Sequence, residues 1–332
     1  MSATDPQRPE PPGEPVQKAE KAKAKGPAEI IQVSTIARRF YLDGRSKVEI
    51  ADEFGLSRFK VARALDIARE SGIVRISIQL PAQIDADLSD RVRAAYGLDR
   101  AIVVAGSDDP AQTHRQLGSV AADLLGEIVE EGDVLGLAWG RTINVMGAEL
   151  TRLAPCTTVQ LGGVFSHRTG DEGSVETVRR AAQLSGGTAY PIYAPLIVPD
   201  ATTARALRED PGIASALSRF ALLTKAVVAI GGWDEQSSTV YQSLGPRLRE
   251  EYRALGVRAE ISGRLFDAEG ASVRTDLEDR LIGVSADQLR AVPEVIAVAG
   301  GPGKAEAVAV MLRSGLVSTM VTDAATARTL VG

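Results

Sequence analysis

Four glycine-containing segments each follow a short apolar run, and their polar residues are of types that bind anions. In the first, Gly140, Arg141 and Thr142 stand between an apolar run and a helical pattern. Backbone N–H groups at a helix start, a threonine hydroxyl and a guanidinium all donate hydrogen bonds to phosphate. The segment matches neither a Walker motif nor a dinucleotide fingerprint. It is a candidate anion site, with a plain glycine turn beside a core Trp139 as the alternative.

The other three segments contain glycine pairs directly after apolar runs. They cover residues 160–163, 231–233 and 300–304. Paired glycines let the backbone approach a ligand or another strand closely, although any single pair is usually a turn. Because four such segments occur at matching places, we predict a ligand site there. The predicted contacts in the second and fourth segments are Gln160, Gly162, Gly163, Gly301 and Lys304.

Charged residues also interrupt an otherwise apolar segment at 261–267. Arg264 and Asp267 there either face water at a sheet edge or line a pocket. Asp323 precedes a helical pattern at 324–330 and is interpreted as its N-cap. Two histidines, His114 and His167, have no recognisable partners, so we assign them no chemistry.

Apolar runs and helical patterns alternate through the larger part of the chain, and they would position these residues. Runs that are apolar throughout are typical of strands covered on both faces, which predicts an α/β fold with a largely parallel sheet. In such sheets ligands bind beyond the carboxyl ends of the strands. The predicted strands are 101–105, 134–138, 157–161, 226–230, 295–299 and 319–322, and the predicted helices are 111–130, 142–153, 174–184, 246–255, 286–291 and 304–314.

A second kind of chemistry is suggested by residues 47–69, where two short helical patterns flank a glycine turn. Gly55 permits the left-handed conformation that stops a helix, and Ser57 is a good N-cap for the next one. Arg58, Lys60 and Arg63 then fall on or near the outer face of the second helix. A helix-turn-helix places base- and phosphate-contacting groups at this position. The pattern favours DNA binding over an ordinary helical hairpin.

Composition and charge fit a small DNA-binding module attached to a larger body. Residues 29–80 carry nine Lys and Arg against seven Asp and Glu, whereas residues 81–332 carry 24 against 32. Residues 1–28 are rich in Pro, Lys, Ala and Glu and are predicted to be a disordered tail. We therefore predict a helix-turn-helix domain at 29–80, including a strand from Ile73 to Ile78, and an effector domain at 81–332.

Several protein classes are disfavoured by the same sequence. No apolar run is long enough to span a bilayer, and no secretory signal peptide is apparent. A single cysteine, Cys156, fits a reducing cytoplasm, where we expect the protein to act. One cysteine and two distant histidines make a structural zinc site improbable, and we expect no metal and no cofactor.

Taken in order, these motifs resemble those of the SorC family of bacterial transcriptional regulators. The resemblance extends from about Ile36 to the C-terminus. It is carried by Ile50-Ala51, Leu56-Ser57, Gly72-Ile73-Val74-Arg75-Ile76, Gly140-Arg141-Thr142, Gln160-Leu161-Gly162-Gly163, Ala194-Pro195-Leu196, Gly263-Arg264-Leu265-Phe266-Asp267, Ala299-Gly300-Gly301-Pro302-Gly303-Lys304 and Val321-Thr322-Asp323. It departs from the family at Lys47, where Gln is common, and at Ala62, where Ser precedes the arginine of the recognition helix.

The resemblance implies a Rossmann-like sugar-binding domain related to glucosamine-phosphate deaminases and ribose-phosphate isomerases, assembled as a homodimer or homotetramer. It implies a regulator of a carbohydrate catabolic operon that binds a palindromic DNA operator and a sugar, sugar alcohol or sugar phosphate. The implied effector contacts lie at Gly140, Arg141, Thr142, Arg264 and Lys304. Lys47 and Ser57 join the three basic residues as predicted DNA contacts.

The rival hypothesis is a sugar-phosphate isomerase or deaminase fused to a DNA-binding module. Such chemistry needs a general base near a carbon acid. Asp267 and Asp323 are the candidate bases, but neither stands in a paired-carboxylate or histidine-containing pattern. We therefore predict a regulator without enzymatic activity.

Overall fold

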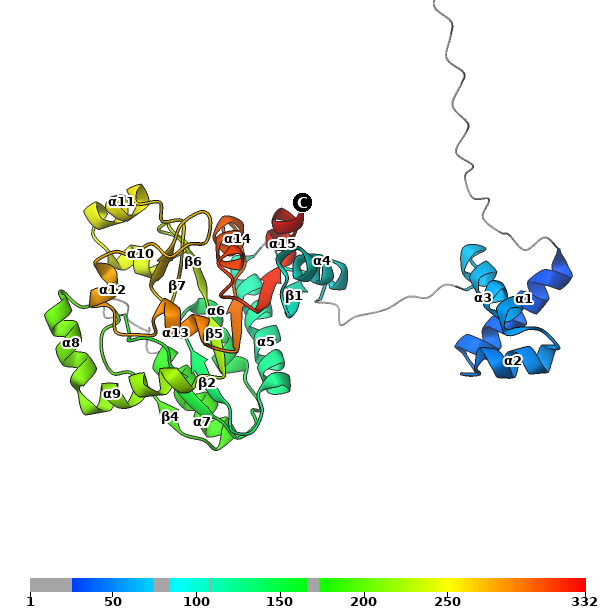
Figure 1. The fold of residues 1–332 in the computed structure, drawn as a ribbon, viewed down its shortest axis with the longest axis horizontal. Coiled ribbons are helices and arrows are strands. Elements are labelled where there is room, and N and C mark those ends of the chain that lie inside the picture. The colour runs from blue at the N-terminus through cyan, green and yellow to red at the C-terminus, as the bar shows by residue number, and fades with distance from the viewer. Residues whose placement is uncertain (1–25, 75–83, 108, 166–172) are drawn as a thin grey trace, which may run out of the picture. The chain divides into compact units, whose positions relative to one another are not determined.

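The computed structural model describes residues 26–74, 84–107, 109–165 and 173–332. These residues form two compact units, one within residues 1–79 and one within residues 80–332. Figure 1 shows both units and labels many of their helices and strands. Each is described separately below.

The N-terminal unit is a three-helix domain. Its helices are α1 (Pro27–Tyr41), α2 (Lys47–Phe54) and α3 (Arg58–Glu70). Helix α1 begins before the predicted boundary at residue 29, since a proline at its first position is preorganised for a helical φ. The buried side chains of all three helices meet in one core, which consists of Val33, Ile36, Ala37, Ile50, Ala51, Val61, Ala64, Leu65 and Ala68. Ala64 completes the buried face of α3, whereas Ala62 is half-buried.

The turn between α2 and α3 contains the predicted glycine turn and serine cap. Gly55 ends α2 with a φ of 61°, in the left-handed region that favours glycine. The Ser57 hydroxyl then accepts a hydrogen bond from the Lys60 N–H and caps α3. Of the strand predicted from Ile73, residues 73 and 74 form a bend and residues 75–78 lie outside the described part of the chain.

The C-terminal unit is built on a seven-stranded sheet in which every neighbouring pair is parallel. The strand order is β1-β10-β9-β5-β2-β3-β4. The strands are β1 (Arg100–Val104), β2 (Val134–Leu137), β3 (Thr157–Gln160), β4 (Ala189–Tyr190), β5 (Lys225–Val228), β9 (Glu294–Val298) and β10 (Thr319–Asp323). The predicted parallel α/β sheet is confirmed.

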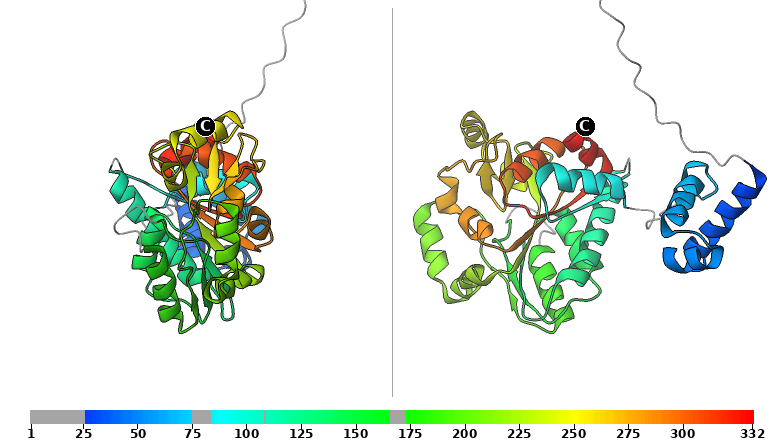
Figure 2. Two further views of the ribbon diagram at one scale, coloured as in Figure 1. Left: turned by 90° about the vertical axis from the view of Figure 1, so that its left-hand side faces the viewer. Right: turned by 45° about the vertical axis from the view of Figure 1, so that its right-hand side comes forward.

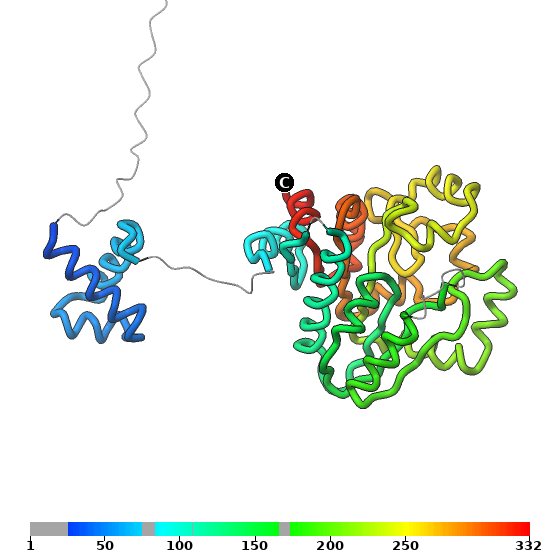
Figure 3. Tube along the Cα trace, turned by 180° about the vertical axis from the view of Figure 1, so that it is seen from behind, coloured from blue at the N-terminus to red at the C-terminus, as the bar shows by residue number. Residues whose placement is uncertain are grey.

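Helices cover both faces of this sheet. Their bounds are α4 (Ala86–Tyr96), α5 (Pro110–Ile128), α6 (Arg141–Glu149), α7 (Gly173–Ser185), α8 (Ala201–Glu209), α9 (Pro211–Leu217), η1 (Ser218–Leu222), α10 (Thr239–Ser243), α11 (Pro246–Ala254), α12 (Leu277–Arg280), α13 (Ala286–Arg290), α14 (Ala305–Arg313) and α15 (Ala324–Val331). Figures 1 and 3, seen from opposite sides, place α4 and α15 beside β1 and α8 and α9 at the other side of the unit.

Two apolar clusters lie on the two faces of the sheet. Along β9, Ile296 and Val298 pack with α5, α6 and α7, whereas Val295 and Ala297 pack with α4, α13, α14 and α15. This alternation buries both sides of each central strand and explains why the strand runs are apolar throughout. Figure 2 gives two further views of these helical layers.

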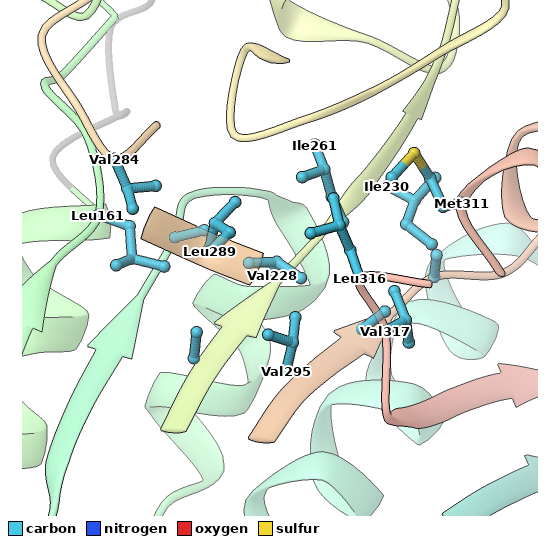
Figure 4. Close-up of a cluster of buried hydrophobic side chains, with 14 of the residues drawn as sticks. Leu161, Val228, Ile230, Ile261, Val284, Leu289, Val295, Met311, Leu316 and Val317 are labelled. Carbon is cyan, nitrogen blue, oxygen red and sulfur yellow. The ribbon is translucent and has the colours of Figure 1, made fainter. Parts of the chain in front are cut away.

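A small antiparallel sheet, which the sequence did not predict, stands beyond the carboxyl ends of the main strands. It contains β6 (Ile230–Gly232), β7 (Ala259–Ile261) and β8 (Arg264–Phe266). The predicted strand at 226–230 is therefore two strands, since β5 ends at Val228 and β6 pairs with β7. Figure 4 shows Ile230 and Ile261 continuing the apolar core above Val228 and Val295.

Candidate functional site

A cavity of about 420 Å³ lies at the carboxyl ends of the central strands β2, β5 and β9. The small sheet and the segment before α10 also contribute residues to its lining. Its lining consists of His114, Ala138, Trp139, Gly140, Arg141, Thr142, Ala229, Ile230, Gly231, Glu235, Gln236, Ser237, Ser238, Thr239, Gln242, Glu260, Ser262, Val298, Ala299, Gly300 and Lys304. A volume of this size holds a small metabolite, and the lining is rich in hydrogen-bonding groups.

Four of the predicted effector contacts line this cavity: Gly140, Arg141, Thr142 and Lys304. The first three follow β2 and open α6, and Lys304 immediately precedes α14. Parallel strands bring these segments together, because their carboxyl ends share one edge of the sheet. Trp139 also lines the cavity, and its indole N–H donates to Thr239 at 3.2 Å.

The start of α6 presents donors to the cavity. Gly140 holds the N-cap position with a φ of 141° and no side chain caps this helix end. The free N–H groups and the helix dipole at such an end favour an anion. The Arg141 guanidinium donates to the Gln236 carbonyl at 3.3 Å and is exposed at the mouth of the cavity.

His114 joins this group, although the sequence gave no reason to assign it chemistry. Its Nδ1 lies 3.0 Å from the Thr142 hydroxyl. Burial lowers the pKa of His114, and the positive charges of Arg141 and Lys304 lower it further. A neutral imidazole at this place orients the threonine hydroxyl. His167 lies outside the described residues.

Lys304 is the half-buried cation of the cavity. Its ammonium donates to the carbonyls of Ile230 and Ser237, both at 2.6 Å. Burial lowers the pKa of Lys304 to about 8, while the carboxylate of Glu260 acts in the opposite direction. Two carbonyls supply only partial compensation for a buried charge, which leaves the site favourable for an anion.

Glu260 was missed from the sequence. It lies in β7 with 5% of its surface exposed, and it accepts hydrogen bonds from the Ser238 hydroxyl at 3.1 Å and the Gly263 N–H at 3.0 Å. Burial raises the pKa of this carboxyl. The available signal was the alternation of Val257, Ala259 and Ile261 with polar residues, which is typical of a strand with one polar face.

Ser262 also lines the cavity and was not predicted. It has a φ of 49°, the only positive φ of a non-glycine residue in the described part of the chain. Its hydroxyl is buried and has no hydrogen-bond partner among the described residues. Backbone strain and an unpartnered hydroxyl at one position are typical of a residue that serves a ligand.

Three predicted effector contacts in the second glycine segment are packing residues outside the cavity lining. The Gln160 amide donates to the Gly162 carbonyl at 2.7 Å and accepts from the Ile192 N–H at 2.9 Å. A Cβ at Gly162 would lie 2.7 Å from the Trp139 ring, and one at Gly163 would lie 2.4 Å from the Ala194 carbonyl. These glycines allow chain segments, and not a ligand, to approach each other.

Arg264, Asp267 and Gly301 also lie outside the lining. Arg264 is buried and donates to the carbonyls of Val284 at 2.8 Å and Gly283 at 3.2 Å, so it joins the small sheet to the loop before α13. Asp267 accepts from the N–H groups of Glu269 and Ala271 in a surface turn. Neither charge therefore lines this cavity: Arg264 is buried, and Asp267 lies at the surface directly after the edge strand β8.

The N–H of Gly301 donates to the Asp323 carboxylate at 2.6 Å. Asp323 also accepts from the N–H groups of Ala325 and Thr326 and caps α15, as predicted. Trp233 is buried in the core, where its indole N–H donates to the Arg249 carbonyl. It packs in the core and does not line the 420 Å³ cavity.

The five predicted DNA contacts all lie on the surface of the N-terminal unit. Lys47 begins α2 with its ammonium 5.8 Å from the Phe40 ring, and Ser57 precedes α3 as its cap. Arg58, Lys60 and Arg63 are exposed on the N-terminal half of α3. Within residues 26–74 none of these three cations forms an ion pair. Their charge is available to a phosphate backbone.

Two kinds of feature are absent from the described residues. No helix among them is long and apolar enough to cross a membrane. No cluster of three or more His, Cys, Asp or Glu side chains that could hold a metal ion occurs in those same ranges.

The doubly covered parallel sheet with polar strand ends defines an α/β ligand-binding domain, and comparison with known proteins defines it further. A family described as "Putative sugar-binding domain" matches residues 81–332. The transcriptional regulator YjhU of Escherichia coli is 31% identical over 88% of this chain and 92% of its own length. The transcriptional regulator LsrR of Escherichia coli is 30% identical over 92% of this chain and 96% of its own.

Solved structures agree. The sorbitol operon regulator SorC from Klebsiella pneumoniae superposes with a TM-score of 0.70 at 22% identity, covering 92% of this chain and all of that one. A domain of a sugar-binding transcriptional regulator from Arthrobacter aurescens has a TM-score of 0.69 at 26% identity, covering 77% of this chain and all of that one. The chain belongs to the SorC family of sugar-binding transcriptional regulators.

Proposed function

We propose that this protein is a DNA-binding transcriptional regulator whose operator affinity is set by a phosphorylated carbohydrate in the 420 Å³ cavity. The observation that carries the proposal is the pairing of two cations, Arg141 and Lys304, with an uncapped helix N-terminus at one end of three central strands. These groups favour an anionic ligand. Hydroxyl and carboxyl groups line the cavity beside these cations.

The remaining polar lining supports a hydroxyl-rich ligand. Ser262 has a buried hydroxyl with no partner among the described residues, and Glu260, Thr142 and Thr239 add further donors or acceptors. A sugar or sugar alcohol bearing one phosphate would satisfy both sets of groups. The cations would hold the phosphate, and the hydroxyl-lined part would read the carbon chain.

Regulation would follow from linkage between the cavity and the N-terminal unit. If DNA and effector each change the other's affinity, thermodynamics requires the same factor in both directions. We propose that α3 of two or more copies binds a palindromic operator, and that the effector changes how the copies assemble. A useful switch needs a coupling of about 1–3 kcal/mol.

One observation favours a second candidate function, an isomerase or deaminase acting on sugar phosphates. Glu260 and Lys304 line one cavity, and burial shifts the pKa of each toward its neutral form. Titratable pairs with shifted pKa values are typical of acid–base catalysis. The two aspartates that the sequence offered as bases, Asp267 and Asp323, hold backbone N–H groups outside the cavity lining.

The test is thermal unfolding of the full chain against sugars, sugar alcohols and their phosphates, each also assayed for turnover. A ligand at 100 times its dissociation constant raises the free energy of unfolding by about 2.7 kcal/mol. We expect stabilisation by phosphorylated compounds only, without product. Stabilisation by unphosphorylated polyols alone would contradict the phosphate assignment, and turnover would support the second candidate.

DNA binding needs its own measurement. Duplexes are selected from a random library by the full chain, and affinity is then measured with and without the stabilising compound. We expect selection of a palindrome and at least a fivefold effect of the compound, which corresponds to about 1 kcal/mol of coupling. A chain that enriches no duplex would refute the DNA-binding part of the proposal.

A further inference from the structure

One large apolar side chain is conspicuous on the DNA-binding helix. Phe59 is the second residue of α3 and has 74% of its surface exposed, next to Arg58. Exposing an aromatic ring of this size to water is unfavourable, and Phe59 does not belong to the three-helix core. A single exposed apolar residue is ordinary by itself, but this ring stands in the first turn of the proposed recognition helix, between two exposed cations.

Helical geometry places Phe59 at the centre of the outer face. The buried residues of α3 are Val61, Ala64, Leu65 and Ala68. At about 100° per residue, Phe59 and Arg63 both point within about 30° of the direction opposite this buried face. Arg58 and Lys60 lie on the two flanks of the helix. Phe59 and Arg63 therefore form the centre of the outer face, and one cation stands on each flank.

The two halves of α3 differ in charge. The N-terminal half carries three cations without ion pairs in residues 26–74, whereas the C-terminal half carries Asp66, Arg69 and Glu70. There the Arg69 guanidinium is held by Asp66 at 2.5 Å. A polyanion therefore meets the N-terminal half, which is the half that carries Phe59.

Resting on the proposed DNA-binding function, we infer that Phe59 is a specificity-determining residue that contacts the C5-methyl group of a thymine in the major groove. Thymine is the base that presents an apolar group there, and apolar side chains recognise it by contact. The Arg58 guanidinium lies 5.1 Å from the Phe59 ring and supports its orientation from one flank. Arg63, one turn further along the outer face, reads a neighbouring base edge, and Arg58 and Lys60 reach phosphates.

The test removes the methyl group from the DNA and the ring from the protein. A duplex selected by the full chain is resynthesised with each thymine replaced, one at a time, by deoxyuridine. Burial of one methyl group is worth about 0.8 kcal/mol, so replacing the contacted thymine of one half-site should weaken binding about fourfold. Phe59→Ala should weaken binding to the unmodified duplex and lose the response to that replacement. Phe59→Leu, which keeps an apolar side chain, should retain it.

Two controls keep the result specific. Leu42→Ala removes an apolar side chain that is 76% exposed outside α3, and it should leave binding and the deoxyuridine response unchanged. Circular dichroism checks that each variant remains helical, as expected because both side chains are exposed.

The inference is overturned if no deoxyuridine duplex differs from the original, or if Phe59→Ala still discriminates the methyl group. A change in oligomeric state without a change in base preference would instead assign Phe59 to a contact between copies. Failure of the proposed function looks different, because the wild-type chain would then enrich no duplex at all.

Discussion

The two units of this chain hold their positive charges in opposite ways. On α3 the cations stand in water along one short stretch of sequence, and Arg58, Lys60 and Arg63 form no ion pair within residues 26–74. In the C-terminal unit Lys304 lines the cavity and donates hydrogen bonds to two carbonyls. The negative charge of Glu260 partly offsets the lowering of the Lys304 pKa by burial. An exposed array suits a long polyanion that is bound at many points, whereas an enclosed cation suits one small anion.

The difference has a consequence for sensitivity. Removing one exposed cation from an array takes away one contact among several, and salt screens what remains. Removing an enclosed cation takes away the main charge of the site and leaves its carbonyl partners without a donor. The predictions below test this contrast, from the largest expected effect to the smallest.

Replacing the enclosed cation should have the largest effect. Lys304→Met should weaken binding of the phosphorylated effector by about 100-fold, since a hydrogen bond to a charged group contributes about 1.5–3 kcal/mol and the charge itself is lost. Isothermal titration calorimetry measures the affinity. Lys225→Met is the matched control, because that lysine pairs with Asp133 at 2.8 Å away from the cavity. Equal losses in both variants would refute the assignment.

Replacing one exposed cation should have a smaller effect. Arg63→Ala should weaken operator binding by about 1–3 kcal/mol and relax the preference at one base pair. Arg69→Ala, on the same helix but already paired with Asp66, should change affinity less than twofold. Fluorescence anisotropy with a selected duplex gives both values. If the two variants behave alike, the outer face of α3 is not the reading surface.

The two kinds of site should also differ in their response to pH. The pKa of Lys304 is about 8 in the free protein, so its charge is present at pH 7 and mostly lost at pH 9. A phosphate remains a dianion across this range. Effector affinity should therefore fall about tenfold from pH 7 to pH 9. The arginines of α3 stay charged, so operator affinity should change little.

Lys304→Arg provides the control for this titration, because an arginine does not lose its proton in the same range. If the variant binds effector, its affinity should stay flat between pH 7 and pH 9.

The stability of the unliganded wild-type chain should instead rise with pH. The pKa of Lys304 is lower in the folded than in the unfolded state, so this group favours folding increasingly as pH rises from about 8 to 10.5. A flat wild-type profile for effector binding would contradict the role of Lys304.

The smallest effect is expected at Ser262. Ser262→Gly removes both the strain of a φ of 49° and the unpartnered hydroxyl. We expect thermal stability to rise by up to about 1 kcal/mol while effector affinity falls severalfold. Ser262→Ala removes the hydroxyl but keeps the strain, so it should lose affinity and gain less stability than Ser262→Gly. A variant that gains stability and keeps full affinity would show that Ser262 has no role in binding.

How well the sequence predicted each part depended on how local the determining contacts are. The glycine turn and serine cap of the helix-turn-helix are encoded within one stretch, and both appear as expected at Gly55 and Ser57. The central strands also appear, since strands buried on both faces leave a continuous apolar signal. The small sheet was missed because its three strands are short and β6 pairs with β7 across about 30 residues.

The candidate cavity was predicted only in part, for the same reason. Gly140, Arg141, Thr142 and Lys304 stand at strand ends, where topology alone implies a ligand site. His114, Glu260 and Ser262 come from a helix and a hairpin whose positions depend on long-range pairing. A sequence pattern could not reveal that Ser262 has a positive φ or that the Glu260 carboxyl is enclosed.

The sequence by itself determined the fold class, the helix-turn-helix and the family, because each depends on residue types at short spacing. Tertiary structure decided which strand-end residues share one cavity. Arg264, a predicted contact, instead donates to the carbonyls of Gly283 and Val284, while Glu260 faces the cavity from the next strand. Successive residues of a strand point to opposite faces of the sheet, so Glu260 and Arg264 lie on different faces. Only the packed structure determines which of these faces lines the cavity.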